Sequence, residues 1–253
     1  MYSIYMYQDG VYVPAEGHLK MLMDSRFRGL TNESFIENQL SYIRRRALFE
    51  FTDTWLALDN CMLNPETLEI EEFSPDVVTR FKLDVAYDPN AICPGGMQFI
   101  QECKADEVLL QEMAGYPLIS GYPIHKAVIL LGEGGQGKTV FMAVIKNILG
   151  TKNVSEVHLR SICSDKFASA ELYGMIANFA GDIESDKLMN AGAFKPATGE
   201  DSLFAQRKNK DPFGFVNRAK LVFSCNILSP TNDQTAGLWV SIGDGSSWTS
   251  TER

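Results

Sequence analysis

The sequence predicts an α/β fold, in which a mostly parallel sheet is covered by helices and a smaller α+β region comes first. Three short, strongly apolar runs, at residues 127–131, 176–180 and 219–225, are typical of strands buried on both faces. Helical periodicity follows the first run over residues 138–149 and stops at Gly150. Parallel pairing is favoured because segments long enough for crossovers separate the runs.

In the first 95 residues, the sequence predicts short hairpins and a helix. Residues 2–7 and 11–13 alternate around Asp9-Gly10, which indicates a hairpin. Apolar residues recur at helical spacing from Asn32 to about Glu50. Residues 56–62 and 69–73 flank turn-forming residues and suggest a second hairpin. A stretch rich in Pro, Asn and Gly at 87–96 is the best boundary, and one helix is expected at 97–114.

Composition limits the class of protein. The chain has 253 residues, of which 45% are hydrophobic, so it can form a real core. Its formal net charge of -9 argues against a surface covered in phosphate-binding residues, although a local basic feature is compatible with it. Five scattered cysteines without a CxxC pair make a zinc site or a disulfide framework unexpected. Without a signal peptide or an apolar run of about 20 residues, we expect a cytoplasmic protein with no membrane partner.

A glycine-rich loop follows the first buried run and matches the phosphate-binding pattern GxxxxGK[ST] in full. Glycines let backbone N–H groups converge on phosphate oxygens, and the next helix points its positive end at them. The lysine would bind the outer phosphates, and the threonine hydroxyl would ligate Mg²⁺. The loop therefore predicts ATP and Mg²⁺ as ligands, bound by Gly132, Gly134, Gly135, Gln136, Gly137, Lys138 and Thr139.

The same glycines also satisfy GxGxxG, the pattern of dinucleotide-binding loops. That pattern requires an acidic residue at the end of the next strand, about 20 residues on. Glu156 stands near that distance, but residues 153–159 make a poor buried strand. The pattern also gives no reason for Lys138 and Thr139, so we favour the triphosphate interpretation.

Two further strands end in polar residues that suit nucleotide hydrolysis. Asp182 follows the run at 176–180 and is the candidate carboxylate for the Mg²⁺ shell, while Glu184 is the candidate general base. Asn226 follows the run at 219–225 and is placed to sense the γ-phosphate. Taken alone, each has an ordinary alternative as a loop, cap or turn residue. The intervals of about 44 residues from Lys138 to Asp182 and from Asp182 to Asn226 each allow one crossover.

A basic turn lies between the last two predicted strands. Residues 204–215 alternate on both sides of Arg207, Lys208 and Lys210, which predicts a hairpin with a cationic tip. Such a tip could follow the backbone of single-stranded DNA, or it could be a solvated turn. A second basic cluster at residues 44–46 points in several directions on a helix, so we interpret it as a solvated face.

Seven stretches together resemble superfamily 3 helicases, and most closely the C-terminal half of phage and plasmid primase–helicases, relatives of the poxvirus uncoating NTPase. The glycine loop corresponds to the first motif of that family, NFAGDIES to the second and KLVFSCNILSPTND to the third, with the hairpin between the last two. The stretches are residues 56–70, 84–100, 109–121, 130–141, 178–185, 194–215 and 220–233.

This resemblance implies a P-loop NTPase with an AAA+-like sheet. It implies a lead-in domain at 1–95, a motor domain at 96–237 and an aberrant tail at 238–253. The family forms rings, so we expect a homo-hexamer that hydrolyses ATP and translocates on single-stranded DNA. Lys138, Asp182, Glu184 and Asn226 would be catalytic. The resemblance leaves room for a separate primase as a partner and places the gene in a phage or prophage, acting in the bacterial cytoplasm.

The sequence departs from the family after Gly237. There the family continues with an aromatic residue and one or two arginines that reach the neighbouring subunit, whereas this chain offers only Arg253. We interpret the tail as a frameshift or premature end. The alternative function is then a prophage remnant that binds ATP without hydrolysing it. A small-metabolite kinase is a third alternative, and the absence of a lid-like arginine cluster argues against it.

Overall fold

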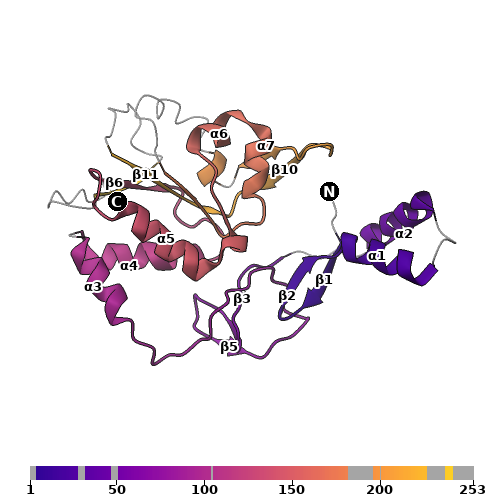
Figure 1. The fold of residues 1–253 in the computed structure, drawn as a ribbon, viewed down its shortest axis with the longest axis horizontal. Helices are drawn as coiled ribbons and strands as arrows, with labels where there is room; N and C mark the ends of the chain where they lie inside the picture. The colour runs from indigo at the N-terminus through magenta and orange to yellow at the C-terminus, as the bar shows by residue number, and fades with distance from the viewer. Residues whose placement is uncertain are drawn as a thin grey trace. The chain divides into compact units, whose positions relative to one another are not determined.

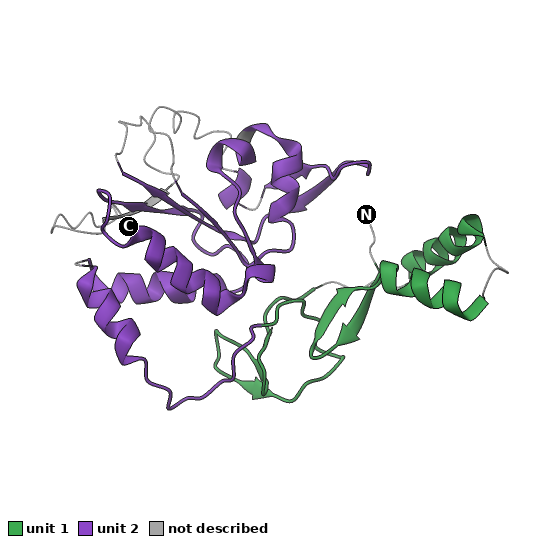
Figure 2. Cartoon of the chain, viewed as in Figure 1, with its two compact units in different colours: residues 1–82 green, residues 83–253 purple. Residues whose placement is uncertain are grey.

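The computed structural model describes residues 4–27, 32–46, 51–103, 105–181, 196–199, 201–226 and 237–241. The chain forms two compact units, Met1–Lys82 and Leu83–Arg253 (Figure 2). The domain limits suggested by the sequence, with a division after residue 95, stay a prediction. Among the helices in the described ranges, none is both long enough and apolar enough to cross a bilayer.

The first unit opens with the hairpin that the sequence predicts. Strands β1 (Tyr5–Gln8) and β2 (Val11–Pro14) pair antiparallel, with Gln8 opposite Val11. Asp9 and Gly10 both have positive φ, at 50° and 87°. That is the backbone of a two-residue hairpin turn, which Asp-Gly adopts readily.

Two helices follow the hairpin. Helix α2 (Glu33–Arg46) confirms the predicted helix, and the Asn32 side chain accepts a hydrogen bond from the Phe35 N–H in its first turn. Helix α1 (Glu16–Phe27) was not predicted, because its apolar residues do not form a face and none of them is buried. The small core of this region comprises Ile4, Ala15, Ile36 and Leu40, with Met6, Leu19, Met23 and Ile43 packed against it.

A three-stranded sheet corrects the second predicted hairpin. Residues 56–62 do not form one strand but hold two, β3 (Leu56–Ala57) and β4 (Met62–Leu63), which pair antiparallel. Strand β5 (Ile70–Glu71) then pairs with β4. The predicted turn between them is confirmed, because the Asn64 carboxamide oxygen accepts hydrogen bonds from the N–H groups of residues 66 and 67.

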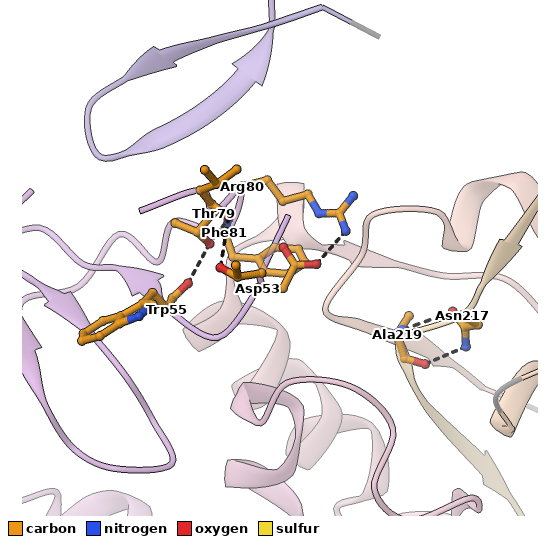
Figure 3. A network of polar contacts seen from close by, with 9 residues as sticks. Asp53, Trp55, Thr79, Arg80, Phe81, Asn217 and Ala219 are labelled. Atoms are coloured by element: carbon orange, nitrogen blue, oxygen red, sulfur yellow. Dashed lines mark hydrogen bonds and ion pairs between the residues drawn. The ribbon is translucent and has the colours of Figure 1, made fainter. Parts of the chain in front are cut away.

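A buried ion pair joins distant parts of this unit (Figure 3). The Arg80 guanidinium contacts the Asp53 carboxylate at 2.7 Å, and the Asp53 side chain is almost fully buried. The guanidinium also lies over the Phe51 ring, 4.5 Å from its centroid. Next to it, the Thr79 hydroxyl donates to the Trp55 carbonyl at 2.7 Å. These contacts tie the segment at 79–80 to the segment at 53–55.

The second unit begins with two helices where the sequence predicts one. Helix α3 (Pro94–Glu102) and helix α4 (Glu107–Gly115) are separate. The prediction of a single helix at 97–114 was wrong because Asp106 starts a new helix: its carboxylate accepts a hydrogen bond from the Leu109 N–H as an N-cap.

A five-stranded parallel sheet forms the centre of the second unit and confirms the predicted fold class (Figure 1). Its order is β12-β6-β11-β8-β7. The three predicted buried strands are there, each within one residue of its expected limits. The strands are β6 (Ala127–Leu131), β7 (Val154–Ser155), β8 (Ala177–Ala180), β11 (Lys220–Cys225) and β12 (Gly237–Ser241).

Helices cover the sheet on both sides (Figure 1). Helix α5 (Lys138–Leu149) has the predicted limits and lies on the same side as α3 and α4. Helices α6 (Leu159–Ser164) and α7 (Lys166–Ser169) lie on the other. Strand β12 falls mostly in the segment expected to be an aberrant tail, yet it pairs along the whole of β6. The 3-10 helices are η1 (Tyr116–Leu118), η2 (Thr151–Asn153) and η3 (Ala170–Leu172).

A buried asparagine holds the edge of this sheet. The Asn178 side chain, on β8, is fully buried. Its oxygen accepts hydrogen bonds from the Ser155 hydroxyl at 2.9 Å and the Val157 N–H at 2.7 Å, and its nitrogen donates to the Val157 carbonyl at 2.9 Å. Strand β7 has only two residues, so these three bonds supplement a short ladder.

We predict that Asn178→Ala lowers the free energy of unfolding by about 3 kcal/mol, because it removes three hydrogen bonds and leaves the peptide groups of Val157 buried without them. Ser155→Ala, which removes one of the three, should cost about 1 kcal/mol. Urea denaturation followed by circular dichroism measures both. Equal effects of the two substitutions would contradict the role assigned to Asn178.

Candidate nucleotide-binding site and basic hairpin

The glycine loop connects β6 directly to α5. Its backbone turns through Gly135 and Gly137, which have φ values of 83° and 88°. Gly137 is the N-cap of α5 and holds a left-handed conformation that side chains with a Cβ adopt only with strain. The loop therefore delivers Lys138 to the first position of the helix, as the sequence predicts.

Lys138 lies inside this loop. The residue is only 7% exposed, although its side chain carries a charge. Its ammonium donates hydrogen bonds to the carbonyls of Gly132 and, at 2.8 Å, of Glu133. Two carbonyls of the loop thus compensate the buried ammonium, which lies beside the backbone that would contact a phosphate.

The loop fits a triphosphate with Mg²⁺. A Cβ added to Gly134 or Gly135 would meet nothing within 4 Å, so the space beside these two residues is open. Thr139 is exposed in the first turn of α5, next to that loop. The side-chain oxygen of Gln136 is buried and has no hydrogen-bond partner within the described ranges, so the loop holds an acceptor that a donor from a ligand could satisfy. The positive end of a three-turn helix adds to the attraction for an anion.

The strand arrangement brings the next predicted position beside the loop. Strand β11 lies between β6 and β8 and is parallel to both, with Cys225 opposite Leu131 and Phe223 opposite Ala180. The Gly132 N–H donates to the Cys225 carbonyl at 3.3 Å. Asn226, the next residue, is exposed and comes directly after the point where β11 meets the loop.

The two predicted acids follow the neighbouring strand. Gly181 comes directly after β8, and a Cβ there would lie 3.6 Å from the Ser224 hydroxyl of β11. Asp182 and Glu184 lie outside the described residues. Their roles stay predictions, and the described end of β8 lies at the same edge of the sheet as the glycine loop.

Strand order also separates the two interpretations of the glycine pattern. In a dinucleotide-binding fold, the strand that follows the first crossover helix lies beside the strand of the glycine loop. Here β7, which follows α5, lies at the far edge of the sheet, beyond β11 and β8. Glu156 comes after β7 and forms an ion pair with Lys146 of α5. The sheet therefore lacks the arrangement that the dinucleotide pattern requires.

Cys225 is a neighbour of the loop that sequence reasoning missed. Burial raises the pKa of the Cys225 thiol, and the Lys138 ammonium acts on it in the opposite direction. On the other side, a Cβ at Gly137 would lie 3.7 Å from the Cys103 sulfur and 3.8 Å from the Phe99 ring. Its position could have indicated this, since Cys225 directly precedes Asn226, the predicted γ-phosphate sensor.

The predicted basic hairpin is confirmed. Strands β9 (Ser202–Ala205) and β10 (Phe213–Val216) pair antiparallel, with Ala205 opposite Phe213. The chain enters the turn through Gln206, whose side chain donates to the Lys210 carbonyl at 3.1 Å. Asn209 has a φ of 60°, which lets the turn close.

The three cations of the turn have different surroundings. The Arg207 guanidinium lies 5.6 Å from the centroid of the Tyr173 ring and 5.8 Å from that of Phe213. These aromatic contacts hold Arg207 against the body of the unit. Lys208 and Lys210 are exposed, and their ammonium groups contact no acid in the part of the chain that the structure describes. They are the two cations of the turn that are available to a ligand.

Known proteins resemble parts of this chain. A model described as a family of unknown function (DUF5906) matches residues 130–236, from the end of β6 to the residue before β12. A Frog virus 3 protein named "Putative helicase 022R" is 26% identical over 137 residues, which are 50% of this chain. The match spans only 14% of that viral protein. The chain thus has a weak relationship to helicases.

Two solved structures resemble the fold in part. The NrS-1 C-terminal region matches with a TM-score of 0.49 and 16% identity, over 69% of this chain and 45% of that one. The JCV helicase matches with a TM-score of 0.40 and 14% identity, over 61% of this chain and 47% of that one. The chain spans about half the length of these structures.

We predict that Gly137→Ala lowers the free energy of unfolding by about 1–2 kcal/mol, because alanine must take the left-handed conformation. The matched control is Gly115, which has right-handed helical backbone (φ -79°) and open space around its Cβ position. Gly115→Ala should raise the free energy of unfolding by about 0.5 kcal/mol. Thermal unfolding of both variants tests the contrast, and a neutral Gly137→Ala would contradict the strained loop.

Proposed function

We propose that this chain is the motor part of an ATP-dependent DNA helicase of the phage and plasmid replication type. The observation that best supports this proposal is the sheet order, in which β11 lies between the strand of the glycine loop and β8. That order brings the ends of three strands to the loop. The similarity to a protein named as a helicase points the same way.

In this proposal the glycine loop binds the phosphates of ATP. Backbone N–H groups of Gly134, Gly135, Gln136 and Gly137 surround the phosphate oxygens, while Gly132 starts the loop with its own N–H bonded to the Cys225 carbonyl. Lys138 exchanges its loop carbonyls for phosphate oxygens, and the Thr139 hydroxyl ligates Mg²⁺. The bound Mg²⁺ supplies the charge that neutralises the phosphate oxygens during transfer.

Three polar residues complete the proposed hydrolytic site. Asp182 holds the water shell of Mg²⁺, and Glu184 accepts a proton from the attacking water. The Asn226 amide hydrogen-bonds to the γ-phosphate or to that water. The support for Asn226 is its place after β11, where the Cys225 carbonyl already accepts a bond from the loop.

Single-stranded DNA is the proposed second ligand. The basic turn at Arg207, Lys208 and Lys210 suits a polyanion, and the chain is otherwise acidic. A hexameric ring of this chain would place one such turn from each copy at its pore. A separate primase is a proposed partner in replication, and the bacterial cytoplasm is the proposed site of action.

The deciding experiment measures ATP turnover with and without a single-stranded oligonucleotide. We predict turnover that DNA stimulates, and we expect Lys138→Ala to lower it by about 100-fold or more, because the charge on the transferred phosphoryl group loses its partner. The matched control is Lys152→Ala, since Lys152 forms an exposed ion pair with Asp84. Its effect should be small.

Two outcomes would contradict the proposal. Tight ATP binding without turnover in the unmodified chain would leave a nucleotide-binding protein rather than a motor. Turnover that responds to a small-molecule acceptor and not to DNA would indicate a kinase. Isothermal titration with ATP, performed beside the turnover assay, separates a failure to bind from a failure to hydrolyse.

The hairpin generates its own prediction. Replacing both Lys208 and Lys210 with alanine should weaken binding to single-stranded DNA and reduce the slope of log K against log salt by about 1.4, since each phosphate contact contributes about 0.7. The control is the double alanine variant of Arg45 and Arg46 on α2, a basic pair of equal charge. An unchanged slope in the hairpin variant would exclude these lysines from phosphate contact.

A further inference from the structure

Phe204 of the hairpin carries an aromatic ring that is exposed and is not part of the hydrophobic core. Alternation gives the hairpin two faces, and Leu203, Ala205, Phe213 and Phe215 share the inner one. Leu203 and Ala205 are buried, and Phe215 packs against the core beneath the sheet. Phe204 lies on the outer face and is 62% exposed. Exposure on this scale leaves most of the ring in water, where it adds little to stability.

The surroundings of Phe204 leave one side of its ring open. Its partner across the ladder is Gly214, which presents no side chain to the ring. A Cβ at Gly214 would lie only 2.7 Å from the Ser202 hydroxyl, so this position does not accept a larger residue without a shift. Glycine opposite a phenylalanine thus leaves the ring without a cross-strand side chain directly against it.

The charge next to this surface indicates what binds there. The turn at residues 206–212 carries Arg207, Lys208 and Lys210 against one acid, Asp211, which leaves a charge of +2 in a chain of net charge -9. Lys208 and Lys210, the two available cations of the turn, follow Phe204 by four and six positions, at most about 13 and 20 Å of extended chain. An aromatic ring within this reach of free cations suits a ligand that combines flat rings with phosphates.

The size of the surface argues against a protein partner. Within the paired strands β9 and β10, the outer face consists of Ser202, Phe204, Gly214 and Val216. A stable protein interface buries about 800 Å² on each side, which needs many more residues than these. A single nucleobase, in contrast, requires only one ring to stack on and a nearby cation for its phosphate.

We infer that Phe204 stacks on a base of single-stranded nucleic acid while Lys208 and Lys210 contact the phosphates next to it. This inference rests on the proposed function. It adds a contact with the base itself to the contacts that the lysines make with the charged phosphates. Stacking tolerates any sequence, because every base offers a flat face. The hairpin would thus bind a single strand by two different interactions.

The test compares oligonucleotides with and without bases. Fluorescence anisotropy at fixed salt measures the affinity of the chain for an oligo(dT), for an abasic oligonucleotide of equal length, and for an oligo(U). We expect Phe204→Ala to weaken binding to oligo(dT) and oligo(U) by about tenfold and to leave binding to the abasic strand unchanged. Phe204→Trp should keep the wild-type affinity. The exposed Phe35 of α2, replaced by alanine, is the control for loss of a surface aromatic.

Each other result overturns a defined part of the inference. Equal affinities of wild type and Phe204→Ala for oligo(dT), with lysine dependence retained, would remove the stacking contact and keep the proposed DNA binding. An equal loss on the abasic strand would mean that Phe204 supports the hairpin instead of a base. If the unmodified chain binds none of the three strands, the inference and the DNA part of the proposed function both fail. Circular dichroism of each variant checks that it is folded.

Discussion

The candidate site depends on the parallel pairing of β11 with β6 on one side and β8 on the other. Parallel strands end at the same edge of a sheet, so this pairing alone brings the glycine loop, the end of β11 and the end of β8 together. The contact between the Gly132 N–H and the Cys225 carbonyl extends the pairing into the loop itself. Gly132 and Cys225, which lie about 90 positions apart in the sequence, thereby become neighbours through backbone hydrogen bonds alone.

Buried side chains hold the segments that have few backbone hydrogen bonds to the sheet. Asn178 ties the short edge strand β7 to β8 through three hydrogen bonds. Asn217 does a similar task where the hairpin returns to β11. Its side chain donates to the Ala219 carbonyl and accepts from the Ala219 N–H (Figure 3). It also donates to the Ala197 carbonyl. Both asparagines are fully buried and bonded, as buried amides must be. Their function is to hold strands in place.

The sequence was most informative where local chemistry determines the structure. The run 127–131, the glycine loop and helix α5 follow one another with the predicted limits, because a buried strand, a glycine turn and an amphipathic helix each have a distinct pattern. The prediction failed where a short-range cap or turn competes with periodicity, as at Asp106, which divides one apolar helical pattern into two helices. Strand order could not be predicted from the residues alone, since it follows from packing between segments far apart in the chain. The same holds for Phe204, because alternation does not say which face of a hairpin will be covered.

The bonds that Lys138 makes to the carbonyls of Gly132 and Glu133 have a consequence for selectivity. An incoming anion must compete with the two carbonyls that already accept hydrogen bonds from the Lys138 ammonium. A small, weakly charged anion such as chloride has little advantage in that exchange. In the proposed nucleotide site, a polyphosphate chain would replace both acceptors at once and would also meet backbone N–H groups and the start of α5. Under that proposal, the bonds within the loop would favour polyphosphates over simple anions.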